Sequence, residues 1–126
     1  MAQRTRASAH RLARCVSEGK IKLDTVRPTM EGLVSEIRGK QKPGGGWSYY
    51  VTRDLKTAGS PSNQAISFIT AATLIALFEA SGAGVRIPPE MRTEAITCME
   101  FFRNPDGTFE YMVFQGADRS HRRPNP

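Results

Sequence analysis

Apolar residues recur at helical spacing in four segments of the chain. The first segment, at about 6–18, is short and basic, and the second, at about 29–40, carries one apolar stripe. The third, at about 65–80, is apolar at nearly every position, which is typical of a helix surrounded by other elements. The fourth begins at Pro88, where two prolines and a glutamate favour a helix start. The pattern therefore predicts an all-α fold.

Two of these helices have residues suited to a helix N-terminus. Pro28 fits the first turn of the second helix, where its missing N–H would be unpaired in any case. The polar residues 20–27 are therefore expected to form a connection. Ser62 or Asn63 is a suitable N-cap for the third helix.

One short phrase occurs twice in the chain. Residues 43–49 and 105–111 share the frame Pro-x-Gly-x-aromatic-x-Tyr, with Trp47 and Phe109 at the first aromatic position. The two copies are 62 positions apart. Each copy follows a helical segment, and its glycine supplies backbone angles at which a helix ends. The phrase therefore predicts a turn that closes each of two helical units.

The same offset aligns apolar positions upstream of the phrase. An internal period of this length indicates stacked supersecondary units. We therefore expect two helix-pair repeats, at about 5–50 and 62–112, within one domain that spans residues 1–117. The basic segment 118–126 has no apolar period and is expected to be disordered.

The first copy of the phrase resembles a known motif. Gln41, Gly45 and Trp47 stand as Gln-x3-Gly-x-Trp, which is similar to the QW motif of triterpene cyclases. In that motif the glutamine and the tryptophan tie a helix end to the next turn. The second copy has Arg103 and Phe109 at these positions, so the expected replacement is a cation–π contact. From about residue 29 to 111, the chain resembles the prenyltransferase and squalene-oxidase repeat of terpenoid cyclases and protein prenyltransferase β subunits.

This resemblance implies an arc of an α/α toroid, because two helix pairs are too few to close a ring. The chain would then be a truncated relative, a piece of a longer protein, or a protomer that completes its ring by association. The third helix of such an arc would leave an apolar flank open to bind an isoprenoid-like ligand or a protein partner, or to self-associate. The candidate apolar face comprises Ile66, Ile69, Leu74, Leu77 and Phe78.

The aromatic rings of both phrases are expected to pack back against their preceding helices. The candidate structural residues of the two phrases are Gln41, Gly45, Trp47, Tyr49, Arg103, Gly107, Phe109 and Tyr111.

This chain lacks the residues with which the resembled family carries out catalysis. Cyclases of the family protonate an isoprenoid with an Asp-x-Asp-Asp motif, and each aspartate here stands alone in sequence. Protein prenyltransferases use zinc held by Asp, Cys and His, but His10 and His121 lie outside the matching region. Cys15 belongs to no Cys/His cluster, and Cys98 is expected to be a buried apolar residue. We therefore expect no catalytic residue, metal or cofactor, and activity only if several chains together supply the missing groups.

Net charge suggests a second hypothesis. The chain carries a formal charge of +6, and its first 42 residues hold ten Lys/Arg against four Asp/Glu. Such a segment is typical of nucleic-acid or anionic-surface contacts and also of solvated helices. The alternative function is thus a basic helical adaptor. Its candidate contact residues are Arg4, Arg6, Arg11, Arg14, Lys20 and Lys22.

The expected location is cytoplasmic. The two cysteines are far apart and unpatterned, which favours a reducing compartment. The most apolar run is shorter than the roughly 18 to 20 residues of a membrane span, and the N-terminus has no apolar stretch typical of a secretory signal.

Overall fold

The computed structural model describes residues 2–48 and 64–114. These residues form four helices, which confirms the predicted all-α class at a coarse level. The helices are α1 (Ala2–Ser17), α2 (Leu23–Gly39), α3 (Ser67–Gly82) and α4 (Pro89–Phe102). Two three-residue strands, β1 (Gln64–Ile66) and β2 (Met112–Phe114), pair antiparallel with Ala65 opposite Val113.

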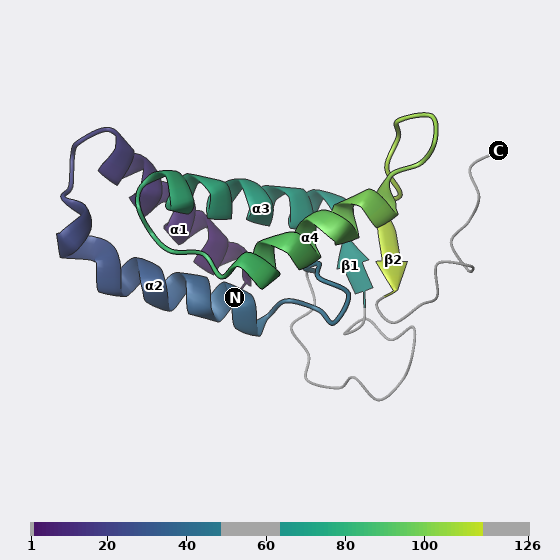
Figure 1. Cartoon of the computed structure of the whole chain (residues 1–126), viewed down its shortest axis with the longest axis horizontal. Coiled ribbons are helices and arrows are strands. Elements are labelled where there is room, and N and C mark those ends of the chain that lie inside the picture. Colours follow the sequence, from purple (N-terminus) through teal and green to yellow (C-terminus); the bar gives the residue numbers. More distant parts are fainter. Residues whose placement is uncertain (1, 49–63, 115–126) are drawn as a thin grey trace.

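The helices form two hairpins with the same orientation. Figure 1 shows α1 and α3 running in one direction, while α2 and α4 return in the other. Helix α3 packs against α1 on one side and α4 on the other, and α1 also packs against α2. The α1–α2 hairpin and the α3–α4 hairpin therefore lie side by side, and α1 and α3 make the contact between them.

Helix α2 begins earlier than the sequence predicts. It starts at Leu23, so the expectation that residues 20–27 form a connection holds for 20–22 and is wrong for 23–27. Leu23 and Val26 pack against the core and continue the apolar stripe that includes Met30, which is fully buried. Pro28 lies inside the second turn rather than in the first. The gain from burying two further apolar side chains evidently exceeds the cost of the one backbone N–H that proline lacks.

The observed starts of α3 and α4 can be compared with those predicted from the sequence. Helix α3 begins at Ser67, two residues later than expected, because residues 64–66 pair with β2 and the backbone N–H of Ile66 donates to the Trp47 carbonyl oxygen (2.9 Å). The predicted N-caps Ser62 and Asn63 lie outside the described residues. Helix α4 begins at Pro89, one residue after the predicted start at Pro88, which is its N-cap.

The core contains residues from every helix and from the turn after α2. Its largest fully buried side chains are Trp47, Phe102, Met30, Ile66, Leu77 and Met91. Cys98 is buried, as predicted, and clusters with Ala65 and Phe102. Trp47, which lies in the turn, thus belongs to one hydrophobic core with buried residues of all four helices.

Leu77 is fully buried, whereas its neighbour Phe78 is 46% exposed. We predict that Leu77→Ala lowers the free energy of unfolding by about 3 kcal/mol, because it removes buried methyl groups and leaves a cavity. Phe78→Ala serves as the matched control and should cost much less. Urea denaturation of both variants measures the difference, and equal losses would contradict this placement of the α3 core side.

Candidate functional site

The first glycine phrase forms a tight turn against α4. The backbone N–H of Lys42 donates to the Gly46 carbonyl oxygen (2.7 Å), and that of Gly45 donates to the Lys42 carbonyl oxygen (2.8 Å). Gly45 has a φ of +103°, and a Cβ atom there would lie 2.2 Å from the backbone oxygen of Glu94. Both the backbone angle and the approach to α4 therefore require glycine at this position.

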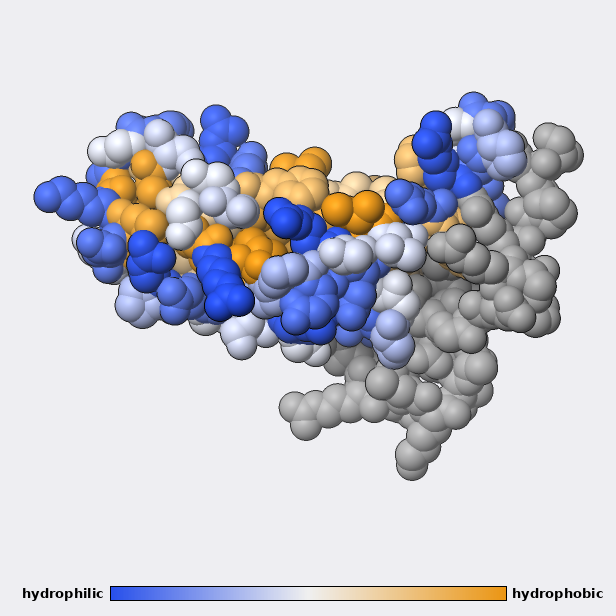
Figure 2. Space-filling view, viewed as in Figure 1, coloured by the Kyte–Doolittle hydropathy of each residue, from blue (hydrophilic) through white to orange (hydrophobic). Residues whose placement is uncertain are grey.

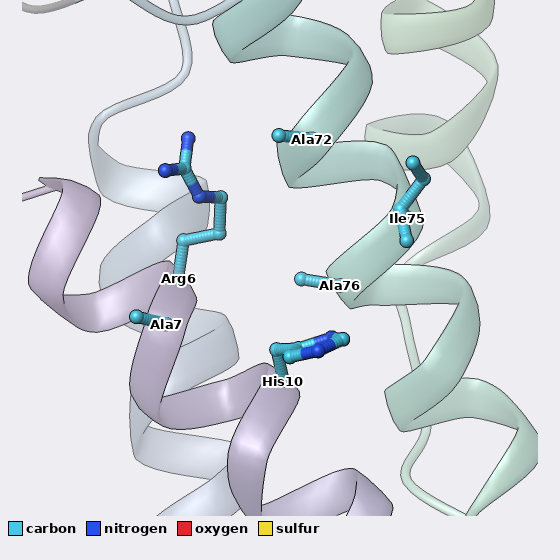
Figure 3. Close-up of a pocket in the computed structure, with 6 residues that line it drawn as sticks. All are labelled: Arg6, Ala7, His10, Ala72, Ile75 and Ala76. Carbon is cyan, nitrogen blue, oxygen red and sulfur yellow. The ribbon is translucent and has the colours of Figure 1, made fainter.

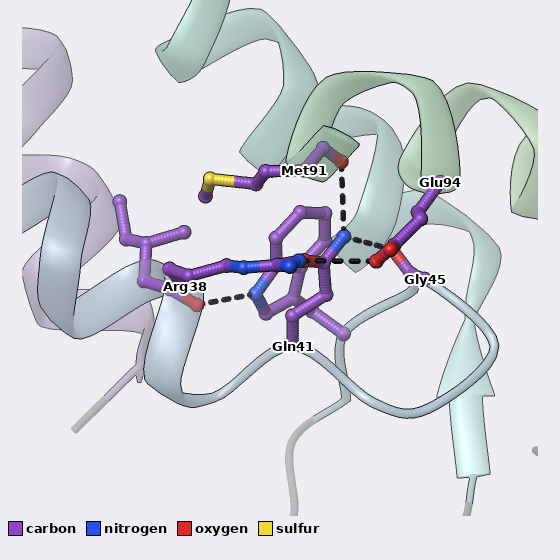
Figure 4. A network of polar contacts seen from close by, with 7 residues as sticks. Arg38, Gln41, Gly45, Met91 and Glu94 are labelled. Atoms are coloured by element: carbon purple, nitrogen blue, oxygen red, sulfur yellow. Dashed lines mark hydrogen bonds and ion pairs between the residues drawn. The ribbon is translucent and has the colours of Figure 1, made fainter. Parts of the chain in front are cut away.

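The side chains of Gln41 and Trp47 fasten this turn to two helices. The Gln41 Nε2 group donates to the carbonyl oxygens of Gly45 (2.8 Å) and of Met91 in α4 (3.0 Å). The indole Nε1–H of Trp47 donates to the Ile37 carbonyl oxygen in the last turn of α2 (2.9 Å). Figure 4 shows Gln41 reaching across to Met91 and Gly45. These two side chains therefore hold the end of α2, the turn and the start of α4 together.

Further contacts join the same turn to α3. The backbone N–H of Trp47 donates to the Thr70 hydroxyl (3.0 Å), and Thr70 is fully buried. Arg38 donates to the Gln41 side-chain oxygen and pairs with the Glu94 carboxylate (3.0 Å), so the amide of Gln41 is held at both ends (Figure 4). The space around Gly46 is also filled, since a Cβ there would lie 2.8 Å from the Cys98 sulfur. The turn is thus the point at which α2, α3 and α4 meet.

The second phrase has the same backbone hydrogen bonds. The N–H of Asn104 donates to the Thr108 carbonyl oxygen (2.7 Å), and that of Gly107 donates to the Asn104 carbonyl oxygen (2.9 Å). Each of these residues lies 62 positions after its counterpart in the first turn. Gly107 has a φ of +89°, and Asp106 accepts from the Thr108 backbone N–H (2.9 Å) as a turn residue does.

The side chains of the second turn are placed differently from those of the first. Phe109 is 50% exposed and Tyr111 is 55% exposed, whereas Trp47 is 2% exposed. The expectation that both copies pack their rings against the preceding helix is therefore wrong for the second copy. Arg103 and Phe109 pair through their backbones, and the described residues show no cation–π contact between them. Tyr49 lies outside the described residues.

The predicted apolar face of α3 also needs correction. Ile66, Ile69, Leu74 and Leu77 are buried in the core, and only Phe78 of the predicted set is exposed. The solvent-facing stripe of α3 comprises Phe68, Ile75 and Phe78. Phe68 was missed in the sequence because an almost uniformly apolar helix gives no polar stripe by which to find its wet side. The spacing of seven and three positions along this stripe is a helical signal, but buried positions show the same spacing.

Large hydrophobic side chains are exposed in one half of the described chain. They are Phe68, Ile75, Phe78, Ile96, Phe109 and Tyr111, all of which follow β1. We call the first four of these, on α3 and α4, the α3–α4 face. Figure 2 shows hydrophobic residues in separate groups on the visible face, both along α3 and α4 and at the end of the molecule where α1 and α2 are joined.

The equivalent positions of the first hairpin are covered. Ala13, which lies 62 positions before Ile75, is completely buried, and Val34, which lies 62 before Ile96, is 4% exposed. Val16, the counterpart of Phe78, is partly buried against the core. These positions of the first hairpin lie in or against the core, whereas their counterparts in the second hairpin are exposed.

A shallow groove lies beside this face, between α1 and α3. It has a volume of about 270 Å³ and is lined by Arg6, Ala7, His10, Ala72, Ile75 and Ala76. Figure 3 shows Arg6 and His10 projecting from α1 toward the alanines of α3. His10 pairs with the Glu79 carboxylate at the edge of this groove. The walls are mostly apolar, so the groove suits an apolar group better than a charged substrate.

Glu36 and Lys42 have shifted pKa values, and neither residue lines the groove. The hydrogen bond from Lys40, followed by one from Thr5, lowers the pKa of the exposed Glu36 carboxyl. Burial lowers the pKa of the Lys42 ammonium group. Glu36 lies in α2, and Lys42 lies in the turn that follows it. Neither residue is therefore part of the α3–α4 face.

Gly45 and Gly107 allow a matched test of the first turn. Both have positive φ, but a Cβ at Gly107 would meet no atom within 4 Å, whereas one at Gly45 would meet the α4 backbone. We predict that Gly107→Ala costs roughly 1 kcal/mol of unfolding free energy from backbone strain alone. Gly45→Ala should cost clearly more, because α4 must also move. Urea denaturation measures the unfolding free energies of both variants. Equal losses would show that the first turn is not packed tightly against α4.

Comparison of the chain with protein-family models, curated proteins and solved structures finds no match in any of the three. Across the described ranges, no group of three or more His, Cys, Asp and Glu side chains is placed to hold a metal ion. No described helix combines the length and apolar character needed to cross a membrane.

Proposed function

We propose that this chain is an α/α repeat module that has no catalytic activity by itself and binds an apolar, isoprenoid-like ligand or a protein partner through the α3–α4 face. The observation that carries the proposal is the contrast between Ile75 and Ile96, which are exposed, and Ala13 and Val34, which are buried at the same repeat positions. In a stack of repeats, each unit covers its neighbour, and an outer unit stays soluble by having a polar outer face. The outer unit here has an apolar face instead.

The relation to terpenoid cyclase and prenyltransferase repeats is part of the same proposal. It is supported by the bonds of Gln41 and Trp47, which tie a helix end to the following turn as the resemblance implies. The shared backbone hydrogen bonds of the two turns, 62 positions apart, also support it. The parallel stacking of two hairpins is the arrangement from which an arc of an α/α toroid is built (Figure 1).

Burial of the α3–α4 face is favourable on physical grounds. Apolar surface removed from water contributes roughly 25 cal/mol per Å². Four large side chains, each 40% to 55% exposed, offer this gain to any ligand or partner that fits them. Large exposed apolar side chains gathered on one pair of helices are a common feature of interaction sites.

We predict that the folded chain at low concentration enhances the fluorescence of a naphthalene sulfonate dye. Ile75→Gln should reduce this enhancement severalfold, because it places a polar group in the centre of the stripe while leaving the buried side of α3 intact. Arg11→Gln, an exposed change on α1, is the control and should leave the enhancement unchanged. A folded chain that ignores the dye would contradict the proposed function.

A second function, binding of nucleic acid or another anionic surface, is favoured by one observation on α1. Arg4, Arg11 and Arg14 are exposed and form no ion pair with any other described residue. A row of unpaired cations along one helix suits a polyanion.

This second function predicts binding to duplex DNA with a steep salt dependence. The log–log slope should be about −0.9 for each phosphate contacted, and Arg11→Gln should make it shallower by about one contact. A fluorescence anisotropy titration over a range of salt concentrations measures both slopes. Absence of binding at low ionic strength would assign these arginines to solvated surface.

A further inference from the structure

The groove between α1 and α3 continues past the ion pair of His10 and Glu79. Its first part, described above, ends at His10. A second hollow of about 330 Å³ is lined by Arg14, Ser17, Glu18, Glu79 and Gly82. Because His10 lines the first hollow and Glu79 lines the second, their ion pair lies where the two hollows meet. We call the two hollows together the α1–α3 groove.

The length of the α1–α3 groove corresponds to several helical turns. Its lining extends from Arg6 to Glu18 on α1 and from Ala72 to Gly82 on α3. At a rise of about 1.5 Å per residue, these stretches are about 18 Å and about 15 Å long. Helices α1 and α3 pack against each other and run in the same direction, so the two stretches lie alongside each other (Figure 1). A partner helix of about twelve residues would match this length.

The α1 edge of the groove carries positive charge that has no ion-pair partner among the described residues. Arg6 and Arg14 line this edge, and neither pairs with a described carboxylate. Each of the two carboxylates that line the groove is already paired with a basic side chain. Figure 3 shows the Arg6 side chain extending between α1 and α3. A partner that brings carboxylates to this edge would therefore form favourable charge pairs.

The α3 edge of the groove is apolar. Ile75 is 55% exposed there, and Ala7, Ala72 and Ala76 also line the groove. Short side chains allow another helix to approach closely, since the distance between packed helices depends on the residues at the contact. A small ligand would stay largely uncovered in so shallow a groove, and a nucleic-acid backbone offers no apolar group to Ile75. An amphipathic helix would meet both edges at once.

We propose that an amphipathic helix of a partner protein binds along the α1–α3 groove, with its apolar stripe over Ile75 and its acidic edge against Arg6 and Arg14. The two arginines are eight positions apart on α1, which corresponds to about 12 Å. Carboxylates about eight positions apart on the partner helix match this distance. This inference rests on the proposed function, because Ile75 also belongs to the α3–α4 face, and it names the kind of protein partner.

The test titrates the full chain into two designed peptides and follows fluorescence anisotropy. Both peptides have blocked ends, a length of about 18 residues, and a stripe of leucine and alanine at helical spacing. One peptide has glutamates about eight positions apart beside this stripe, and the other has lysines at the same positions. We expect the glutamate peptide to bind and the lysine peptide to bind about tenfold more weakly or not at all.

Variants of the chain locate the binding site. Arg6→Glu and Arg14→Glu should each raise the dissociation constant of the glutamate peptide about fivefold, because like charges then face each other. The double variant R6E/R14E should instead prefer the lysine peptide, which a merely destabilised chain would not do. Ile75→Gln should also weaken binding. Arg92→Glu, an exposed change on α4 with the same effect on net charge, is the control and should leave binding unchanged. Circular dichroism verifies that every variant is folded.

Several outcomes would overturn this inference. Failure of the glutamate peptide to bind would do so, as would equal weakening by Arg6→Glu and Arg92→Glu, because net charge alone would then attract the peptide. A double variant that does not prefer the lysine peptide would place the acidic contact elsewhere. Binding of decanoate that depends on Arg6, without binding of the glutamate peptide, would assign the groove to a small anionic amphiphile. A dimer in sedimentation velocity that Arg6→Glu dissociates would assign it to a second copy of this chain.

The dye experiment separates the two proposals. A chain that enhances dye fluorescence but does not bind the glutamate peptide would overturn this inference and leave the proposed function standing. A folded chain that binds neither the dye nor the peptide would overturn both.

Discussion

The structure depends on the hydrogen bond from the Trp47 indole to the Ile37 carbonyl oxygen and on the burial of that ring. A tryptophan ring adds a large apolar area to the core, and its N–H must find an acceptor when it is buried. The last turn of α2 supplies this acceptor: the Ile37 carbonyl oxygen accepts from the indole and also from the Lys40 backbone N–H (3.1 Å). One side chain thus fills part of the core and ties the turn to the last turn of α2. The Gln41 bond to Met91 extends the same tie to the second hairpin.

The sequence predicted those elements whose signals are local. Pro88 and Pro89 mark the start of α4, and the Pro-x-Gly-x-aromatic phrase marks two turns that share their backbone hydrogen bonds. The start of α2 was missed because Leu23 and Val26 are isolated apolar residues in a polar stretch, and only their packing against the core shows that they belong to a helix. Local preference for proline at a first turn was outweighed there by tertiary burial.

The candidate site was predictable to a smaller extent, because its position depends on packing between hairpins. The residues that hold the first turn, Gln41, Gly45 and Trp47, were predictable because they stand at the spacing Gln-x3-Gly-x-Trp. Which side of α3 meets water was not evident, because Phe68 and Leu77 are equally apolar in sequence and differ only in what lies over them. The partners of Gln41 in α4 are likewise 50 positions away and follow from the stacking of hairpins.

In the two turns, backbone atoms determine the shape of the loop, and side chains determine which other elements the loop contacts. The loop is closed by bonds between backbone groups of Lys42, Gly45 and Gly46, and the same bonds close the second loop with Asn104, Gly107 and Thr108 in their places. The side chains decide what the loop contacts: Gln41 and Trp47 bond the first loop to α4 and α2, whereas Phe109 of the second loop is half exposed. A repeat of this kind is therefore modular at a resolution finer than the hairpin: changing Arg103 and Phe109 alters what the turn can join without altering the turn. The first turn is thus packed in the core between helices, whereas the second has the same backbone hydrogen bonds with its Phe109 and Tyr111 rings about half exposed.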